Sequence, residues 1–138
     1  MSATQLDPRG PRFVAAVTTV VLVVVLVTGS GWLALAQTAV FAAGSVDPRW
    51  NPYALAYRYL VQPRLGPPAE REDAAPVRFA QRVGFVFLAV TTAGYLSGLT
   101  ALGVTFAGFG LAAAFLNAVF GLCLGCEVYL MLARVRKA

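Results

Sequence analysis

Four apolar runs, separated by polar or glycine-rich breaks, constrain this chain more than any other feature. They cover approximately residues 13–28, 32–44, 80–98 and 102–133. A helix of about 20 residues crosses the hydrocarbon of a bilayer, and lipid tolerates only segments whose backbone hydrogen bonds are internal. Hydrophobic residues make up 59% of the sequence and charged residues 12%, outside the usual range of soluble domains. We therefore expect an all-α, polytopic membrane protein with a single domain, residues 1–138, of four transmembrane helices in two hairpins.

The lengths of the runs are uneven. The second run is short for a membrane crossing, and the fourth is long. A long apolar helix can tilt, project beyond the bilayer or bend. If the fourth helix bends, Gly108 and Gly110 are the expected positions.

Basic residues all lie on one side of this predicted arrangement. They precede the first run, lie in or border the loop 45–79, and follow the last run. Cytoplasmic loops retain Lys and Arg, so both termini and this loop are predicted to be cytoplasmic. Lipid is then the expected partner of the basic residues, and nucleic acid is not. An alternative, a cleaved secretory signal ending at residues 34–36, would leave an odd number of spans.

The central loop contains a helix start signal. Asn51 is a favourable N-cap, and Pro52 suits a first helical turn. Tyr53, Tyr57 and Leu60 follow at helical spacing. The pattern predicts a short interfacial helix with aromatic side chains at the membrane surface. An arginine-lined site for a small anion is the alternative interpretation.

The residues before the two predicted hairpins are similar. Residues 7–13 (DPRGPRF) and 73–79 (DAAPVRF) keep Asp, Arg and Phe at the same offsets. A duplicated hairpin would explain this similarity, because membrane bundles are often built from repeats. The ordinary frequency of Pro and Arg before cytoplasmic helix ends explains it equally well.

The last apolar run contains a Cys-x-x-Cys-Glu sequence. On one continuous helix Cys123, Cys126 and Glu127 would share a face in the inner half of the membrane. A carboxyl group there is costly unless it is neutral, paired or hydrated, which indicates function. The two thiols could exchange disulfides or persulfides while Glu127 takes up and returns the proton. The alternative is that the cysteines only pack and Glu127 pairs with an arginine.

The redox setting leads to a further expectation about the pair. A cytoplasmic location is reducing, so we expect a dithiol ground state. Cys126, nearer the surface on a continuous helix, is expected to meet a soluble partner, and Cys123 to resolve the intermediate. The chain has no His and offers two thiols and one carboxyl here, so neither a metal nor a cofactor is predicted.

Small residues recur every fourth position before and within this segment, at Ala113, Asn117, Gly121 and Gly125. Such a seam lets helices approach closely in lipid. It predicts a helix-packing contact, either within the bundle or across a homo-oligomer.

The segments DPRGPRF, PRLGPP, RFAQRVGFVF and AAFLNAVFGLCLGCEVYL resemble the bacterial membrane family called domain of unknown function 4395. The resemblance covers essentially the whole chain and is most specific around the Cys-x-x-Cys-Glu sequence. The family has no established activity. Its relatives are often encoded near rhodanese-type sulfurtransferases and thioredoxin-like proteins, which implies sulfur or thiol traffic and a partner of one of these types.

Taken together, these features predict a thiol-disulfide or persulfide relay protein of the bacterial inner membrane. A structural subunit, or a transporter component for a small sulfur species without redox chemistry, is the alternative. Whether the chain is an enzyme is left open.

Overall fold

The computed structural model describes residues 5–6, 9–66 and 72–137. Its helices are α1 (Arg9–Thr28), α2 (Gly31–Val46), α3 (Pro52–Ala56), α4 (Gln62–Leu65), α5 (Ala74–Ser97), α6 (Thr100–Phe120) and α7 (Leu124–Lys137). A 3-10 turn, η1 (Pro48–Trp50), precedes α3, and a π-helical turn, η2 (Tyr57–Val61), joins α3 to α4. Two short strands, β1 (Gln5–Leu6) and β2 (Glu72–Asp73), pair antiparallel. The predicted all-α class is confirmed.

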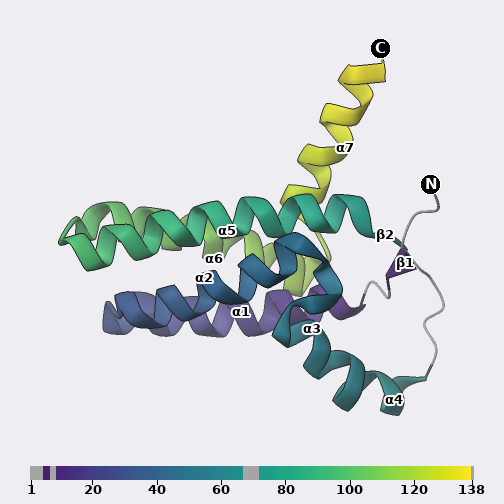
Figure 1. The fold of residues 1–138 in the computed structure, drawn as a ribbon, viewed down its shortest axis with the longest axis horizontal. Coiled ribbons are helices and arrows are strands. Elements are labelled where there is room, and N and C mark those ends of the chain that lie inside the picture. Colours follow the sequence, from purple (N-terminus) through teal and green to yellow (C-terminus); the bar gives the residue numbers. More distant parts are fainter. Residues whose placement is uncertain (1–4, 7–8, 67–71, 138) are drawn as a thin grey trace.

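The long helices α1, α2, α5 and α6 lie side by side as a bundle (Figure 1). Helix α2 packs mainly on α5, whereas α6 packs on both α1 and α5. Helices α1, α5 and α6 are long and apolar enough to cross a membrane, and α2 is a shorter apolar helix of 16 residues. Large apolar side chains cover the outside of the bundle, including Val27 at 81% exposure and Phe109 at 59%. Such an apolar surface is suited to lipid.

Polar side chains bridge the helices inside the bundle. The Gln37 amide donates to the Thr18 hydroxyl at 3.2 Å, and the Thr38 and Thr92 hydroxyls are 3.0 Å apart. Hydrogen bonds of this kind hold helices together where lipid gives no hydrophobic driving force. They connect α2 to α1 and to α5.

The helix predicted in the central loop is present. Asn51 is its N-cap, because the side-chain oxygen of Asn51 accepts a hydrogen bond from the Tyr53 N–H at 2.9 Å. The aromatic face differs from the prediction. The Tyr53 hydroxyl donates to Gln37 in α2, and Tyr57 is buried against Phe13 of α1, with ring centroids 5.7 Å apart. Both rings pack on the end of the bundle because they find partners there.

The prediction of one long helix over residues 102–133 is wrong. Helix α6 ends at Phe120, and Gly121 adopts a left-handed conformation with φ 69°. Glycine takes this conformation without steric cost, which is why it commonly ends helices. The N–H groups of Gly121 and Leu122 donate to the carbonyls of Asn117 and Leu116, and α7 then leaves the bundle sideways (Figure 1). Gly108 and Gly110, the expected bend positions, lie within α6.

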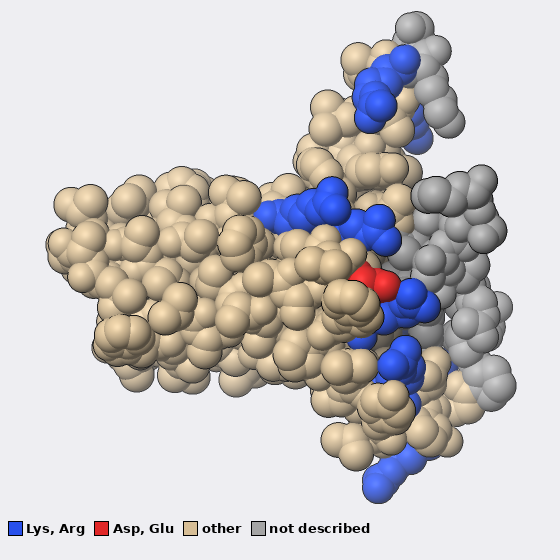
Figure 2. Space-filling model, viewed as in Figure 1, with Lys and Arg blue, Asp and Glu red and all other residues tan. Residues whose placement is uncertain are grey.

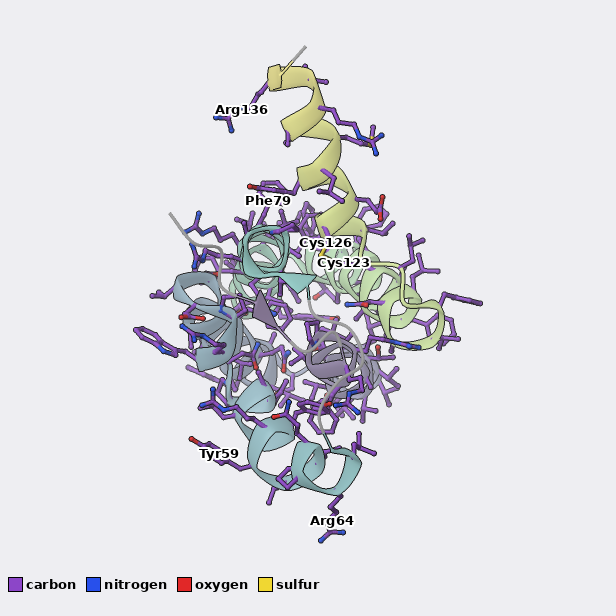
Figure 3. All side chains as sticks on the ribbon, turned by 90° about the vertical axis from the view of Figure 1, so that its right-hand side faces the viewer. Tyr59, Arg64, Phe79, Cys123, Cys126 and Arg136 are labelled. Atoms are coloured by element: carbon purple, nitrogen blue, oxygen red, sulfur yellow. A yellow bond between two sulfur atoms is a disulfide. The ribbon has the colours of Figure 1, made fainter. Side chains whose placement is uncertain are left out.

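Some features of the two halves of the chain correspond. The segments that precede α1 and α5 meet as the β1–β2 pair. Phe79 of α5 contacts Tyr129 of α7 with ring centroids 5.7 Å apart, as Phe13 of α1 contacts Tyr57. Helices α4 and α7 leave the same end of the bundle in opposite directions (Figures 1 and 3). These correspondences support a duplicated unit of two long helices followed by a projecting helical segment.

The contact between α5 and α7 can be tested at Gly125. A Cβ added at Gly125 would lie 2.7 Å from the Cα of Ala80, so Gly125→Ala is expected to destabilise the fold by about 1–3 kcal/mol, the usual cost of overpacking. Gly108→Ala is the matched control, because its Cβ would meet nothing within 4 Å. Thermal unfolding in detergent should show a lower midpoint for Gly125→Ala alone. Equal midpoints would mean that α7 does not pack on α5 as described.

Candidate functional site

The two cysteines lie where α7 begins. Cys123 precedes the helix and Cys126 is in its first turn, with Cα atoms 5.2 Å apart. The two sulfur atoms are joined in a disulfide at the base of α7 (Figure 3). The structure thus describes the oxidised pair, where the sequence led us to expect a dithiol.

Cys123 acts as the N-cap of α7. Its carbonyl accepts a hydrogen bond from the Glu127 N–H at 3.0 Å, which is the first helical bond. Its Sγ accepts a hydrogen bond from the Cys126 N–H at 3.1 Å. An N-cap side chain normally accepts from an N–H of the first turn in this way. On reduction, the same N–H and the positive end of the helix would stabilise a thiolate at Cys123.

The pair lies at the end of the bundle, where α1 and α5 begin. Cys126 packs against the buried Val77 in the first turns of α5. Arg12, near the start of α1, donates hydrogen bonds to the carbonyls of Ala118 and Val119, which end α6. Helix α6 thus brings the cysteines to the end of the bundle where α1 and α5 start, and their depth in a membrane stays a prediction.

Glu127 is exposed rather than buried in the bundle. The reason is again the break, since α7 projects outward and carries this side chain with it. Glu127 lies in the first turn of α7, where a carboxylate is favoured by the helix dipole. Within the described part of the chain, no cluster of three or more His, Cys, Asp or Glu could hold a metal ion.

The four residues of the predicted seam do not form one stripe, because they lie on both sides of the break. Gly121 ends α6, and Gly125 packs against Ala80 of α5. Ala113 and Asn117 instead line a cavity inside the bundle.

This cavity has a volume of about 590 Å³ and extends between α1, α5 and α6 to the base of α7. Most of its lining side chains are apolar, and its polar lining residues are Thr18, Gln81, Asn117 and Cys123. A cavity of this size and character is typical of small-molecule sites. One cysteine of the disulfide, Cys123, therefore borders a space large enough for a ligand.

Basic side chains gather at the same end of the molecule (Figure 2). Arg58, Arg64 and Arg82 are exposed there. Arg49 forms an ion pair with Asp47 at 2.8 Å, and its hydrogen bond lowers the pKa of the Asp47 carboxyl below the usual value. This end of the bundle thus presents positive charge around the bases of both projecting segments.

The model of the family described as Domain of unknown function (DUF4395) matches residues 6–134. The chain belongs to this family. No curated protein and no solved structure gives a match. The family description assigns no activity, so the function of this member has to be inferred from its own geometry.

Sequence reasoning found both cysteines of this DUF4395 member but not the cavity. The lining residues come from helices far apart in the sequence, for example Thr18 from α1, Gln81 from α5 and Asn117 from α6. Thr18, Gln81 and Asn117 are polar residues within predicted apolar spans, and this pattern was a signal in the sequence.

Proposed function

We propose that this chain is a four-span protein of the bacterial cytoplasmic membrane that exchanges disulfides or persulfides at the cytoplasmic face. The observation that carries this proposal is the Cys123–Cys126 disulfide at the N-terminus of α7, where a backbone N–H already contacts Cys123 Sγ. Buried structural cysteines need no such environment, whereas reactive cysteines commonly have one.

The membrane arrangement rests on length and charge. Three helices are long enough to span, and α2, with 16 residues, reaches about 24 Å, short of the roughly 30 Å of hydrocarbon. We take α2 as the fourth membrane span, because it is apolar and its side chains form hydrogen bonds with both α1 and α5. The turns at the opposite end of the bundle, residues 29–30 and 98–99, carry no charge. The basic end is then cytoplasmic, and α4 and α7 lie along the membrane surface.

The proposed exchange begins at Cys123. A partner thiolate attacks Cys123 Sγ, a new disulfide forms, and Cys126 leaves as a thiolate that takes up a proton. The partner's second thiolate then attacks its own sulfur in the mixed disulfide and releases Cys123 as a thiolate. Hydrogen sulfide in place of the first thiolate would leave a persulfide on Cys123 and a thiol on Cys126.

This assignment reverses the order expected from the sequence. That order relied on a continuous helix with Cys126 nearer the surface, and the break at Gly121 removes its basis. Cys123 is the capping sulfur, so it is the better nucleophile in the reduced protein. The same sulfur forms the mixed disulfide in both directions of the reaction.

The proposed exchange requires a soluble partner and a group that carries the proton. A cytoplasmic protein with an exposed reactive thiol, rhodanese-type or thioredoxin-like, matches the required chemistry. Glu127 follows Cys126 directly in the sequence and is open to solvent, and we propose it as the group that exchanges the proton of the leaving thiolate.

The proposed topology predicts the outcome of reporter fusions. Fusions at Ala138 and after Gly66 should both report a cytoplasmic location, and an insertion in the turn at Gly98 should report the opposite side. A periplasmic signal from either of the first two would show that the orientation is wrong.

Trapping with serine variants tests the exchange. Cys126→Ser should accumulate a mixed disulfide or persulfide on Cys123, because the resolving thiol is absent. Cys123→Ser, the matched control, should trap little. Mass spectrometry of the affinity-purified protein measures both.

Glu127→Gln should slow exchange, because it removes the proposed proton carrier, and the rate of exchange with a soluble dithiol measures the effect.

The alternative function predicts a different result of the trapping experiment. A structural subunit, or a transporter component without redox chemistry, would show no trapped species in either variant. It would also retain function in cells when both cysteines are replaced by serine.

A further inference from the structure

The cavity beside the disulfide has no role in exchange with a soluble partner. It extends from Cys123 into the bundle as far as Leu22 of α1 and Phe109 of α6. Phe109 is 59% exposed, so the cavity opens at the outer surface of the bundle. With the bundle in a membrane, that opening would face lipid, and the occupant would arrive from the bilayer.

The chemistry of the lining restricts the occupant. Within the described chain, none of the lining residues is Asp, Glu, Lys or Arg. Burying an ion without a counter-charge is costly, so a neutral molecule is favoured. Phe41, Phe87 and Phe109 provide aromatic faces from three helices, which suits a planar ring.

The polar lining residues suit a ring that carries carbonyl groups. Asn117 supplies amide N–H donors from α6. Gln81 also lines the cavity, and because its Oε1 accepts a hydrogen bond from Asn51 at 3.0 Å, its amide nitrogen is the group that can donate to a ligand. Ligand cavities of this kind combine an apolar lining with a few polar groups that orient the ligand.

The redox cycle itself requires a second reactant. Each time the pair oxidises a soluble dithiol, it becomes reduced, and two electrons must leave before the next turnover. Cys123 is one of the residues that line the cavity, so an occupant would lie beside the pair.

We propose that the cavity binds a lipophilic quinone, which re-oxidises the reduced Cys123–Cys126 pair. This inference rests on the proposed redox function and names its electron acceptor. In the first step the Cys123 thiolate adds to the quinone ring, so a carbon–sulfur bond forms and the electron pair moves to the ring oxygen, which takes a proton.

In the second step the Cys126 thiolate attacks Cys123 Sγ. The disulfide forms as the carbon–sulfur bond breaks, and the electron pair remains with the ring, which takes the second proton and leaves as hydroquinone. Two thiols and one quinone therefore yield one disulfide and one hydroquinone.

The test uses the purified full chain, reduced, freed of reductant and kept anaerobic in detergent. Decylubiquinone is the probe, because its fully substituted ring reacts slowly with free thiols. Hydroquinone is followed by ultraviolet absorbance and the cysteines by mass spectrometry. Wild type should form one hydroquinone for each disulfide.

A cavity-filling variant gives the specific comparison. Ala113 lines the cavity, so Ala113→Leu should slow oxidation by decylubiquinone by about 10²-fold, an effect typical of misplacing reactants by about 1 Å. Ala101→Leu, on the same helix but exposed and outside the cavity, should match wild type. Reduction of the disulfide by soluble dithiothreitol should be unchanged in both variants.

Each outcome separates this inference from the proposed function. Normal exchange with soluble thiols but no oxidation of wild type by decylubiquinone would overturn the quinone site alone. Equal quinone rates in Ala113→Leu and wild type would also overturn it. Loss of both reactions in wild type would instead remove the proposed function.

A second measurement covers the case in which Ala113→Leu does not fold. Photo-cross-linking of wild type with an azido-quinone should label peptides that contain residues 109–117, and an excess of decylubiquinone should prevent it. Labelling confined to other segments would refute the site. So would a tightly co-purifying phospholipid that decylubiquinone cannot displace, since the cavity would then hold an acyl chain.

Discussion

The left-handed conformation of Gly121 determines the geometry on which the rest of the site depends. Had α6 continued through this residue, Cys123 would be an interior residue of one helix and not the residue that caps a new one. The turn ends α6 at Phe120 and lets a new helix start at Leu124. Cys123 thereby becomes a cap, with an N–H on its sulfur and the positive end of α7 beside it. Glu127, in the first turn of α7, is open to solvent.

A helix that follows a pair of long helices is capped in each half of the chain. In the first half, Asn51 caps the helix that follows the first pair of long helices, and its amide is buried and bonded to Gln81. In the second half, Cys123 occupies the corresponding place before α7. Asparagine and cysteine both accept a hydrogen bond from a backbone N–H there, but only cysteine can also exchange electrons. One half thus uses the cap for structure, and we propose that the other uses it for chemistry.

Local signals in the sequence predicted the start of a helix correctly, but they did not predict the end of α6 at Gly121. Asn51 and Pro52 indicated a helix start, because capping depends only on adjacent residues. That prediction is confirmed. Gly121 was read as part of a packing seam, because its neighbours on both sides are apolar and hydropathy does not distinguish a left-handed glycine from a helical one. The exposure of Glu127 followed from that break and was missed with it. The cavity depends on how three distant helices pack, which no local pattern encodes.

The redox state of the cysteines in native membranes tests the central claim most directly. Rapid acid quenching, followed by differential alkylation and mass spectrometry, would give the oxidised fraction of the Cys123–Cys126 pair before a brief thiol-oxidant challenge, during it and after recovery. If the pair exchanges electrons with the cell, the oxidised fraction should rise and then return, and both cysteines should change together. A fraction that stays constant at fully reduced or fully oxidised throughout would show that the pair is structural, and it would contradict the account.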